Sequence, residues 1–291
     1  LLADHLDIRP HNLLFTAGAD GAIRMVFEAF LSPGEKVLLT SPTFAMFSIY
    51  ACMYGGHVIY LPYEASETGP LLTADTICQS LVVHRPRLFC LSNPDSPTGT
   101  IFQAGELTRI IQTAADIGAV ILVDEAYYPF SNVTALNLIH TFPNLVISRT
   151  FAKAWGLAGL RLGYAAANSE MANILHKVRP MYEVNGLALA AMAKMIIRKG
   201  DMEMSVRRIH DGKAYFLERM RGNGFRVLEG AGNFLHVDFG ETRNAIHAAL
   251  KGKVLYKTSF PDACLEGFSR FSAAPKPVMA ELANLVDGAL R

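Results

Sequence analysis

The sequence predicts an α/β fold, in which a mostly parallel sheet covered by helices is followed by a smaller α+β unit. Short apolar runs alternate with amphipathic helical patterns, as is typical of parallel strands buried on both faces. Polar clusters directly follow these runs, and ligands of such sheets bind beyond the carboxyl ends of the strands. The pattern changes near residue 186, so we expect a large domain over residues 1–185 and a small domain over residues 186–291.

The elements of the large domain follow from local patterns. Strands are expected at residues 13–16, 36–40, 87–92, 119–123 and 145–148. A helix is expected over residues 21–31, because its apolar side chains recur with helical spacing, and the next helix is marked by apolar positions between 107 and 115.

The small domain begins with a long helical stretch toward Arg221, which Gly222-Asn223-Gly224 interrupts. A final helix closes the chain. Between them, strands are expected at residues 225–228, 233–239, 253–256 and 268–272.

Composition excludes some classes of function. The 291 residues are 51% hydrophobic, which is enough for a large core. The 27 basic and 26 acidic residues give a net charge of +1, which argues against extended binding to nucleic acid or to a membrane surface. We expect no membrane-spanning helix, because the longest apolar helical candidate is interrupted by Lys194.

The four cysteines lie far apart without a CxxC pair, and the nine histidines show no metal-binding spacing. We therefore expect free thiols, a cytoplasmic location and no metal site. The chain starts with Leu rather than Met, within a helical pattern, so we expect part of the natural N-terminus to lie upstream.

The segment SRTFAKAWGLAGLRLGY places a lysine shortly after a buried strand. A partly desolvated Lys153 can form a Schiff base with an aldehyde. Thr150 and Arg161 flank it, and a hydroxyl with a guanidinium suits a phosphate on that aldehyde. The alternative is a strand-end lysine beside a glycine-rich turn, without chemistry.

The segment VDEAYYPF ends a fully apolar strand. Asp124 would be buried there, and a buried carboxylate needs a partner such as a pyridinium nitrogen, which Tyr127 could also reach. One alternative is an Asp that caps a helix. Another is a metal-binding acid of a nucleotide hydrolase, which the lack of a GxxxxGK[ST] loop disfavours.

Two further segments supply a phosphate site and an aromatic surface. In TAGADGAIRM, the backbone at Ala19 and Asp20 enters a helix whose free N–H groups and dipole favour a phosphate. In SPTFAMF, Phe44 can stack on an aromatic ring, and a core position fits the pattern as well. With the lysine and the carboxylate, these groups fit pyridoxal 5'-phosphate (PLP).

These motifs resemble those of fold-type-I PLP enzymes of the class I/II aminotransferase group. The chain is most similar to histidinol-phosphate aminotransferases and to the related threonine-phosphate decarboxylases. The lysine and DEAYYPF segments are highly specific, SPTF and AGAD are supporting, and the likeness runs from AGAD to the C-terminal helix.

The resemblance implies a role for each matching residue. Lys153 would bind PLP as a Schiff base, Asp124 would pair with its ring nitrogen, and Tyr127 would bond its ring hydroxyl. Phe44 would stack on the ring. The phosphate would be bound by the backbone at Ala19 and Asp20 and by the side chains of Thr150 and Arg161.

On the substrate side, Arg270 in GFSRFSAA matches an arginine that binds a carboxylate or phosphate, and Lys257 stands where the histidinol-phosphate enzymes tend to have a second arginine. The asparagine of the family's Asn-Pro-Thr-Gly loop bonds the ring hydroxyl. In SNPDSPTG, alignment on the following Pro-Thr-Gly gives this position to Ser96. Asn93 would then shape the loop or contact substrate.

The chain departs from the family pattern at three points. Ala152 replaces a frequent serine and so lacks a phosphate ligand, and Lys257 lacks the bidentate fork of arginine. The family's N-terminal segment, which gives a tyrosine to the neighbouring subunit's cofactor, has no counterpart.

The resemblance implies a homodimeric aminotransferase of amino-acid biosynthesis. It would move an amino group from an amino acid or an amino-alcohol phosphate to a keto acid such as 2-oxoglutarate. Two alternatives stay open: a PLP-dependent decarboxylase of a phosphorylated amino acid, and a non-catalytic paralogue that keeps the fold.

Overall fold

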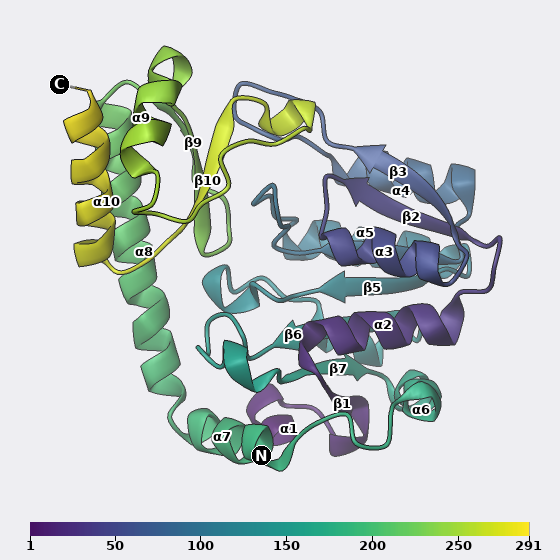
Figure 1. Ribbon diagram of the computed structural model, residues 1–291. Helices are drawn as coiled ribbons and strands as arrows, with labels where there is room; N and C mark the ends of the chain where they lie inside the picture. Colours follow the sequence, from purple (N-terminus) through teal and green to yellow (C-terminus); the bar gives the residue numbers. More distant parts are fainter. Residues whose placement is uncertain (291) are drawn as a thin grey trace.

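The computed structural model describes residues 1–290 and contains two sheets (Figure 1). The larger sheet has the strand order β1-β7-β6-β5-β4-β2-β3. Its strands from β3 to β6 are parallel, whereas β7 runs antiparallel to both of its neighbours. The strands are β1 (Leu13–Thr16), β2 (Lys36–Ser41), β3 (His57–Pro62), β4 (Leu88–Ser92), β5 (Val120–Asp124), β6 (Leu145–Thr150) and β7 (Gly163–Ala167).

Helices cover both faces of this sheet. One face packs against α2 (Gly18–Phe30), α3 (Ala45–Met53) and α6 (Ser169–Val178). The other packs against α1 (Leu2–Leu6), α4 (Ala74–His84), α5 (Ala104–Asp116) and α7 (Gly186–Ile197). Within residues 1–290, none of the helices has the length and apolar character needed to cross a bilayer.

Local sequence explains these elements. In α5, a buried stripe with helical spacing faces the sheet, and a capping box between Gln103 and Glu106 starts the helix. All five residues of β5 are buried, which is why its sequence is apolar without alternation.

A three-stranded antiparallel sheet follows, in the order β10-β9-β8. Its strands are β8 (Arg226–Leu228), β9 (Phe234–Asp238) and β10 (Phe268–Ser272). Its core is completed by α8 (Lys199–Gly222), α9 (Arg243–Leu250) and α10 (Lys276–Ala289). The long helix α8 starts beside α7 and ends beside the small sheet (Figure 1). Six 3₁₀ turns complete the described elements: Pro10–Asn12, Tyr128–Phe130, Leu136–His140, Ala158–Leu160, Gly240–Thr242 and Ala263–Leu265.

The predicted α/β architecture is confirmed, with two local errors. Residues 253–256 form no strand, and their neighbour Lys257 makes only an isolated bridge to Arg270. The helical stretch after residue 186 is two helices, α7 and α8, that meet at Arg198.

Strands β3 and β7 were not predicted. β3 is an exposed edge strand that ends in proline, so its pattern is weak. β7 has the sequence GYAAA, whose small residues have low β propensity. It is a strand because β1 and β6 pair with it on either side.

Small residues in β7 allow α2 to approach the sheet. A Cβ on Gly163 would lie 2.3 Å from the carbonyl carbon of Gly18 and 2.5 Å from the amide nitrogen of Ala19. The first turn of α2 therefore packs directly on the backbone of β7. Gly163 pairs with Thr150 at the end of β6, so this contact fixes the helix N-terminus beside that strand end.

We predict that Gly163→Ala destabilises the protein by about 1–3 kcal/mol, because the added methyl group must displace backbone atoms. Urea unfolding measures this change. Gly159→Ala is the matched control, since a Cβ there meets no atom within 4 Å. Equal unfolding midpoints for the two variants would contradict the packing described above.

Candidate active site

A row of three polar residues lies across the carboxyl ends of the central strands. Ser92 of β4 pairs with Asp124 of β5, and Asp124 pairs with Ser148 of β6. Ser148 Oγ donates a hydrogen bond of 2.8 Å to Asp124 Oδ1. The parallel register thus gathers residues that are far apart in the sequence.

Asp124 is a buried carboxylate that lacks an ion-pair partner among the described residues. It is 6% exposed, and burial raises its pKa to about 6, although hydrogen bonds from Ser148 and from the backbone at Ala126 work in the opposite direction. Such a group favours a nearby cation, and the positive charge of Lys153 already acts in this sense.

Lys153 lies in the bend after β6, and its Nζ is 5.0 Å from the centroid of the Tyr127 ring. Its side chain is exposed, so the expected partial desolvation is wrong for this structure. Lys153 lies three residues beyond the end of β6, outside the buried sheet, and lines the pocket.

The N-terminus of α2 and Arg161 form a basic corner. Gly18 starts the helix with φ +75°, and a Cβ at this position would lie 2.8 Å from Nη2 of Arg161. Free N–H groups of the first turn thus lie beside a guanidinium, which is an anion-binding arrangement. Thr150 Oγ1 accepts a hydrogen bond of 3.1 Å from the amide of Ala152.

One pocket of about 450 Å³ gathers these groups. All but one of the predicted site residues line it. They are Ala19, Asp20, Phe44, Ser96, Asp124, Tyr127, Thr150, Lys153, Arg161, Lys257 and Arg270.

The side of the pocket next to the small sheet carries two basic residues. Arg270 Nη1 donates to Ser96 Oγ at 3.4 Å, and its guanidinium carbon lies 5.1 Å from the centroid of the Phe234 ring. Lys257 exchanges two backbone hydrogen bonds with Arg270, which brings both side chains to the same pocket.

Asn93 is the exception. It is fully buried, its Nδ2 donates to the carbonyl of Phe102, and its Oδ1 accepts from the amide of Phe102. Asn93 therefore shapes the loop, and a direct contact with substrate is wrong for this structure. Asp95 and Thr98 are also bonded to each other within the loop, which leaves Ser96 as the polar residue that the loop places at the pocket, beside Pro94 and Pro97.

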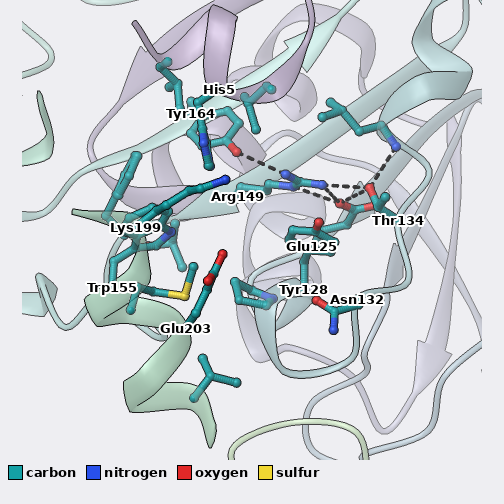
Figure 2. Close-up of a pocket in the computed structure, with 18 of the residues that line it drawn as sticks. His5, Glu125, Tyr128, Asn132, Thr134, Arg149, Trp155, Tyr164, Lys199 and Glu203 are labelled. Carbon is teal, nitrogen blue, oxygen red and sulfur yellow. Dashed lines mark hydrogen bonds and ion pairs between the residues drawn. The ribbon is translucent and has the colours of Figure 1, made fainter. Parts of the chain in front are cut away.

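A buried ion pair lies on the other side of these strand ends (Figure 2). Arg149 Nε and Nη2 donate to Glu125 Oε2 at 2.9 and 2.8 Å, and Nη2 also donates to Thr134 Oγ1. The guanidinium carbon lies 3.9 Å from the centroid of the Tyr128 ring. These residues line a second pocket, of about 650 Å³, because neighbouring residues of a strand point to opposite sides.

Sequence reasoning missed Ser92, Ser148 and Phe234. The two serines carry a readable signal, because each ends or nearly ends an apolar run, as Asp124 does. Phe234 carries no such signal, since its contact with Tyr127, at 5.4 Å between ring centroids, joins distant parts of the chain.

Solved structures share the fold of this chain. Histidinol-phosphate aminotransferase from Sinorhizobium meliloti, solved in complex with pyridoxal-5'-phosphate, has a TM-score of 0.89 and 23% identity, covering 100% of this chain and 79% of that chain. L-threonine-O-3-phosphate decarboxylase from Porphyromonas gingivalis has a TM-score of 0.79 and 22% identity, covering 98% and 88%. The fold is that of the fold-type-I PLP-dependent enzymes.

The family follows from the sequence comparisons. Residues 2–288 match the model of the family "Aminotransferase class I and II". Histidinol-phosphate aminotransferase from Caldanaerobacter subterraneus is 30% identical over 285 residues, which are 97% of this chain and 79% of the relative. This chain belongs to the class I and II aminotransferases.

We predict that Asp124→Asn stabilises the cofactor-free protein at neutral pH. Since folding raises the pKa of Asp124 from 3.8 to about 6, the folded protein binds its proton more tightly, and stability falls as the pH rises through this range. The decline is about 1–3 kcal/mol and is absent in the asparagine variant.

Urea unfolding at pH 4.5 and 7.5 tests this expectation. The advantage of Asp124→Asn over wild type should grow between the two pH values. Asp211→Asn, at an exposed position on α8, should show no such growth. A constant difference between Asp124→Asn and wild type would refute the role of burial.

Proposed function

We propose that this chain is a PLP-dependent aminotransferase. The proposal rests mainly on one observation: Lys153, Asp124 and the basic corner of Arg161 and the α2 N-terminus line the same pocket. An amine, a carboxylate and an anion site match the aldehyde, the ring nitrogen and the phosphate of PLP, in that order.

The polar groups of the pocket fit this cofactor. Ser92 Oγ, Thr43 Oγ1 and Asp20 Oδ1 are buried without a hydrogen-bond partner among the described residues, and all three residues line the pocket. Buried polar atoms are rarely left unpaired in proteins. Together with the carboxylate of Asp124, which is hydrogen-bonded but has no ion-pair partner among the described residues, they support a polar ligand with hydroxyl and cationic groups.

When bound, PLP supplies an electron-withdrawing ring that stabilises a carbanion at the Cα of an amino substrate. Lys153 Nζ is the base that takes the proton from this Cα and delivers it again. The carboxylate of Asp124 holds a proton at the ring nitrogen. Tyr127 and Ser96 would hold the ring through its hydroxyl, and Phe44 would pack against the ring.

The donor is proposed to be an amino-alcohol phosphate such as histidinol phosphate, with 2-oxoglutarate as acceptor. Arg270 and Lys257 support this class, because they provide two cations for a phosphate or a distal carboxylate. The relatives named histidinol-phosphate aminotransferase support it as well.

A decarboxylase of a phosphorylated amino acid is the second candidate. It is favoured by similar solved structures that carry the names L-threonine-O-3-phosphate decarboxylase and "a decarboxylase from Sulfurospirillum multivorans". The same residues would bind PLP. Release of CO₂ rather than formation of glutamate and a keto phosphate distinguishes the two reactions.

We also propose a homodimer, whose interface lies beside the pocket. Met181 and Tyr182 are 81% and 90% exposed, and the next residue, Glu183, accepts a hydrogen bond from the amide of Ala17 at the start of α2. Large exposed apolar side chains at such a position favour contact with a second copy.

We propose a division into two domains, which the two sheets support. Because α7 (Gly186–Ile197) packs on the large sheet, we assign it to the large domain and not, as expected from the sequence, to the small one. The four cysteines are all unpaired, which supports a cytoplasmic location.

We predict that the wild-type protein with bound PLP is yellow. It should convert histidinol phosphate and 2-oxoglutarate into the corresponding keto phosphate and glutamate. Lys153→Ala should lose the visible absorbance and reduce kcat by about 100-fold or more, because it removes the base. The exposed Lys194→Ala is the matched control and should keep both properties. A colourless wild type that does not bind PLP would indicate the non-catalytic paralogue.

We predict that Tyr182→Ser shifts the protein from dimer toward monomer in light scattering coupled to size exclusion. Loss of a large apolar side chain from a dimer interface weakens association. Tyr60→Ser, at an exposed position on the edge strand β3, is the control. A wild type that is monomeric at all concentrations would contradict the proposed interface.

A further inference from the structure

Lys213 is a buried lysine without a carboxylate partner among the described residues. It lies in α8, is 2% exposed, and its Nζ donates to the carbonyls of Gly230 and Gly232 at 2.6 and 2.9 Å. Burial lowers its pKa to about 8, which the charge of Glu229 opposes. Burying an ammonium group costs free energy unless the group is hydrogen-bonded. The two hydrogen bonds to the carbonyls of residues 230 and 232 are therefore needed to keep Lys213 at this position.

Lys213 is hydrogen-bonded to the segment of residues 230–232, which joins β8 to β9. This segment packs on the loop after β4 that contains Ser96 and Gly99. Ala231 donates a backbone hydrogen bond of 2.8 Å to the carbonyl of Gly99. A Cβ on Gly99 would lie 2.8 Å from Cα of Gly230, so the two backbones touch with no room for a methyl group. Gly99 closes the loop that carries Ser96.

The same segment leads into Phe234, the first residue of β9. The Phe234 ring lies against Gly232, against the guanidinium of Arg270 at 5.1 Å and against the Tyr127 ring at 5.4 Å. The Phe234 ring thus contacts both Arg270, the proposed substrate-binding arginine, and Tyr127, the proposed cofactor-binding tyrosine.

We propose that Lys213 is a positioning residue for substrate, which fixes Arg270 relative to Ser96 through residues 230–232 and Phe234. This proposal rests on the proposed function of Arg270. Lys213 itself does not line the pocket, and its hydrogen bonds are to residues 230 and 232, not to Lys153, Asp124 or Arg161. Its loss should therefore weaken anion binding at Arg270 much more than the binding of PLP.

Lys213→Met tests the proposal, because it keeps the length of the side chain and removes the donors. In the PLP-loaded protein, calorimetry should show that the Kd values of inorganic phosphate and of 2-oxoglutarate rise about tenfold. In the activity assay, the KM for 2-oxoglutarate should rise by a larger factor than kcat falls. The Kd of PLP for the cofactor-free protein should change less than about twofold.

Lys213→Arg retains the donors and should recover most of the anion affinity, whereas the exposed Lys194→Met should behave as wild type. Equal weakening of PLP and anion binding, or no change in either, would overturn the proposal. The calorimetric measurements need no turnover, so they decide it even if the wild type fails to transaminate histidinol phosphate.

If Lys213→Met does not fold, Phe234→Leu tests the same connection from its other end. It should weaken phosphate and 2-oxoglutarate binding selectively, since the ring no longer supports Arg270. Unchanged anion affinity in Phe234→Leu would count against the connection.

Discussion

The ion pair between Glu125 and Arg149 is the interaction on which the site depends. It joins the ends of β5 and β6 on the side away from the candidate cofactor pocket, with both side chains almost fully buried. Asp124 directly precedes Glu125, and Thr150 directly follows Arg149. A pair that is buried and fully hydrogen-bonded tolerates the loss of neither partner, because the other charge would be left uncompensated. The two strand ends therefore hold their relative position.

The two sides of these strand ends differ in how their polar groups are satisfied. On the ion-pair side, Thr134 and the amide of Ala135 complete the hydrogen bonds of Glu125. On the cofactor side, the Ser92 hydroxyl has no hydrogen-bond partner and Asp124 has no ion-pair partner among the described residues. On the ion-pair side, the polar groups of Glu125 and Arg149 have their hydrogen-bond partners within the folded protein. The cofactor side keeps buried polar groups that are available to a ligand, as is usual where function is favoured over stability.

Much of the fold and the proposed site could be read from the sequence. Buried parallel strands are apolar throughout, so a polar residue at the strand end, such as Asp124, is conspicuous. Lys153 was found because it lies close to a strand end along the chain, and Arg161 because it follows Lys153 by eight residues in the same segment. Phe234 and Lys213 were not found, because their contacts join α8, β9 and the loop at Gly99, and local patterns carry no information on such distant packing.

Lys257 has a consequence for the evolution of specificity. It lies outside any regular strand, attached to β10 only by an isolated bridge to Arg270, and its side chain is exposed. Replacing it alters the charge at the pocket without disturbing a core or a sheet. Under the proposed function, selection can therefore change the preferred acid or phosphate of the substrate at this single position, while the buried groups at the ends of β5 and β6 stay unchanged. Duplicated genes of such a family can diverge in substrate long before they diverge in fold.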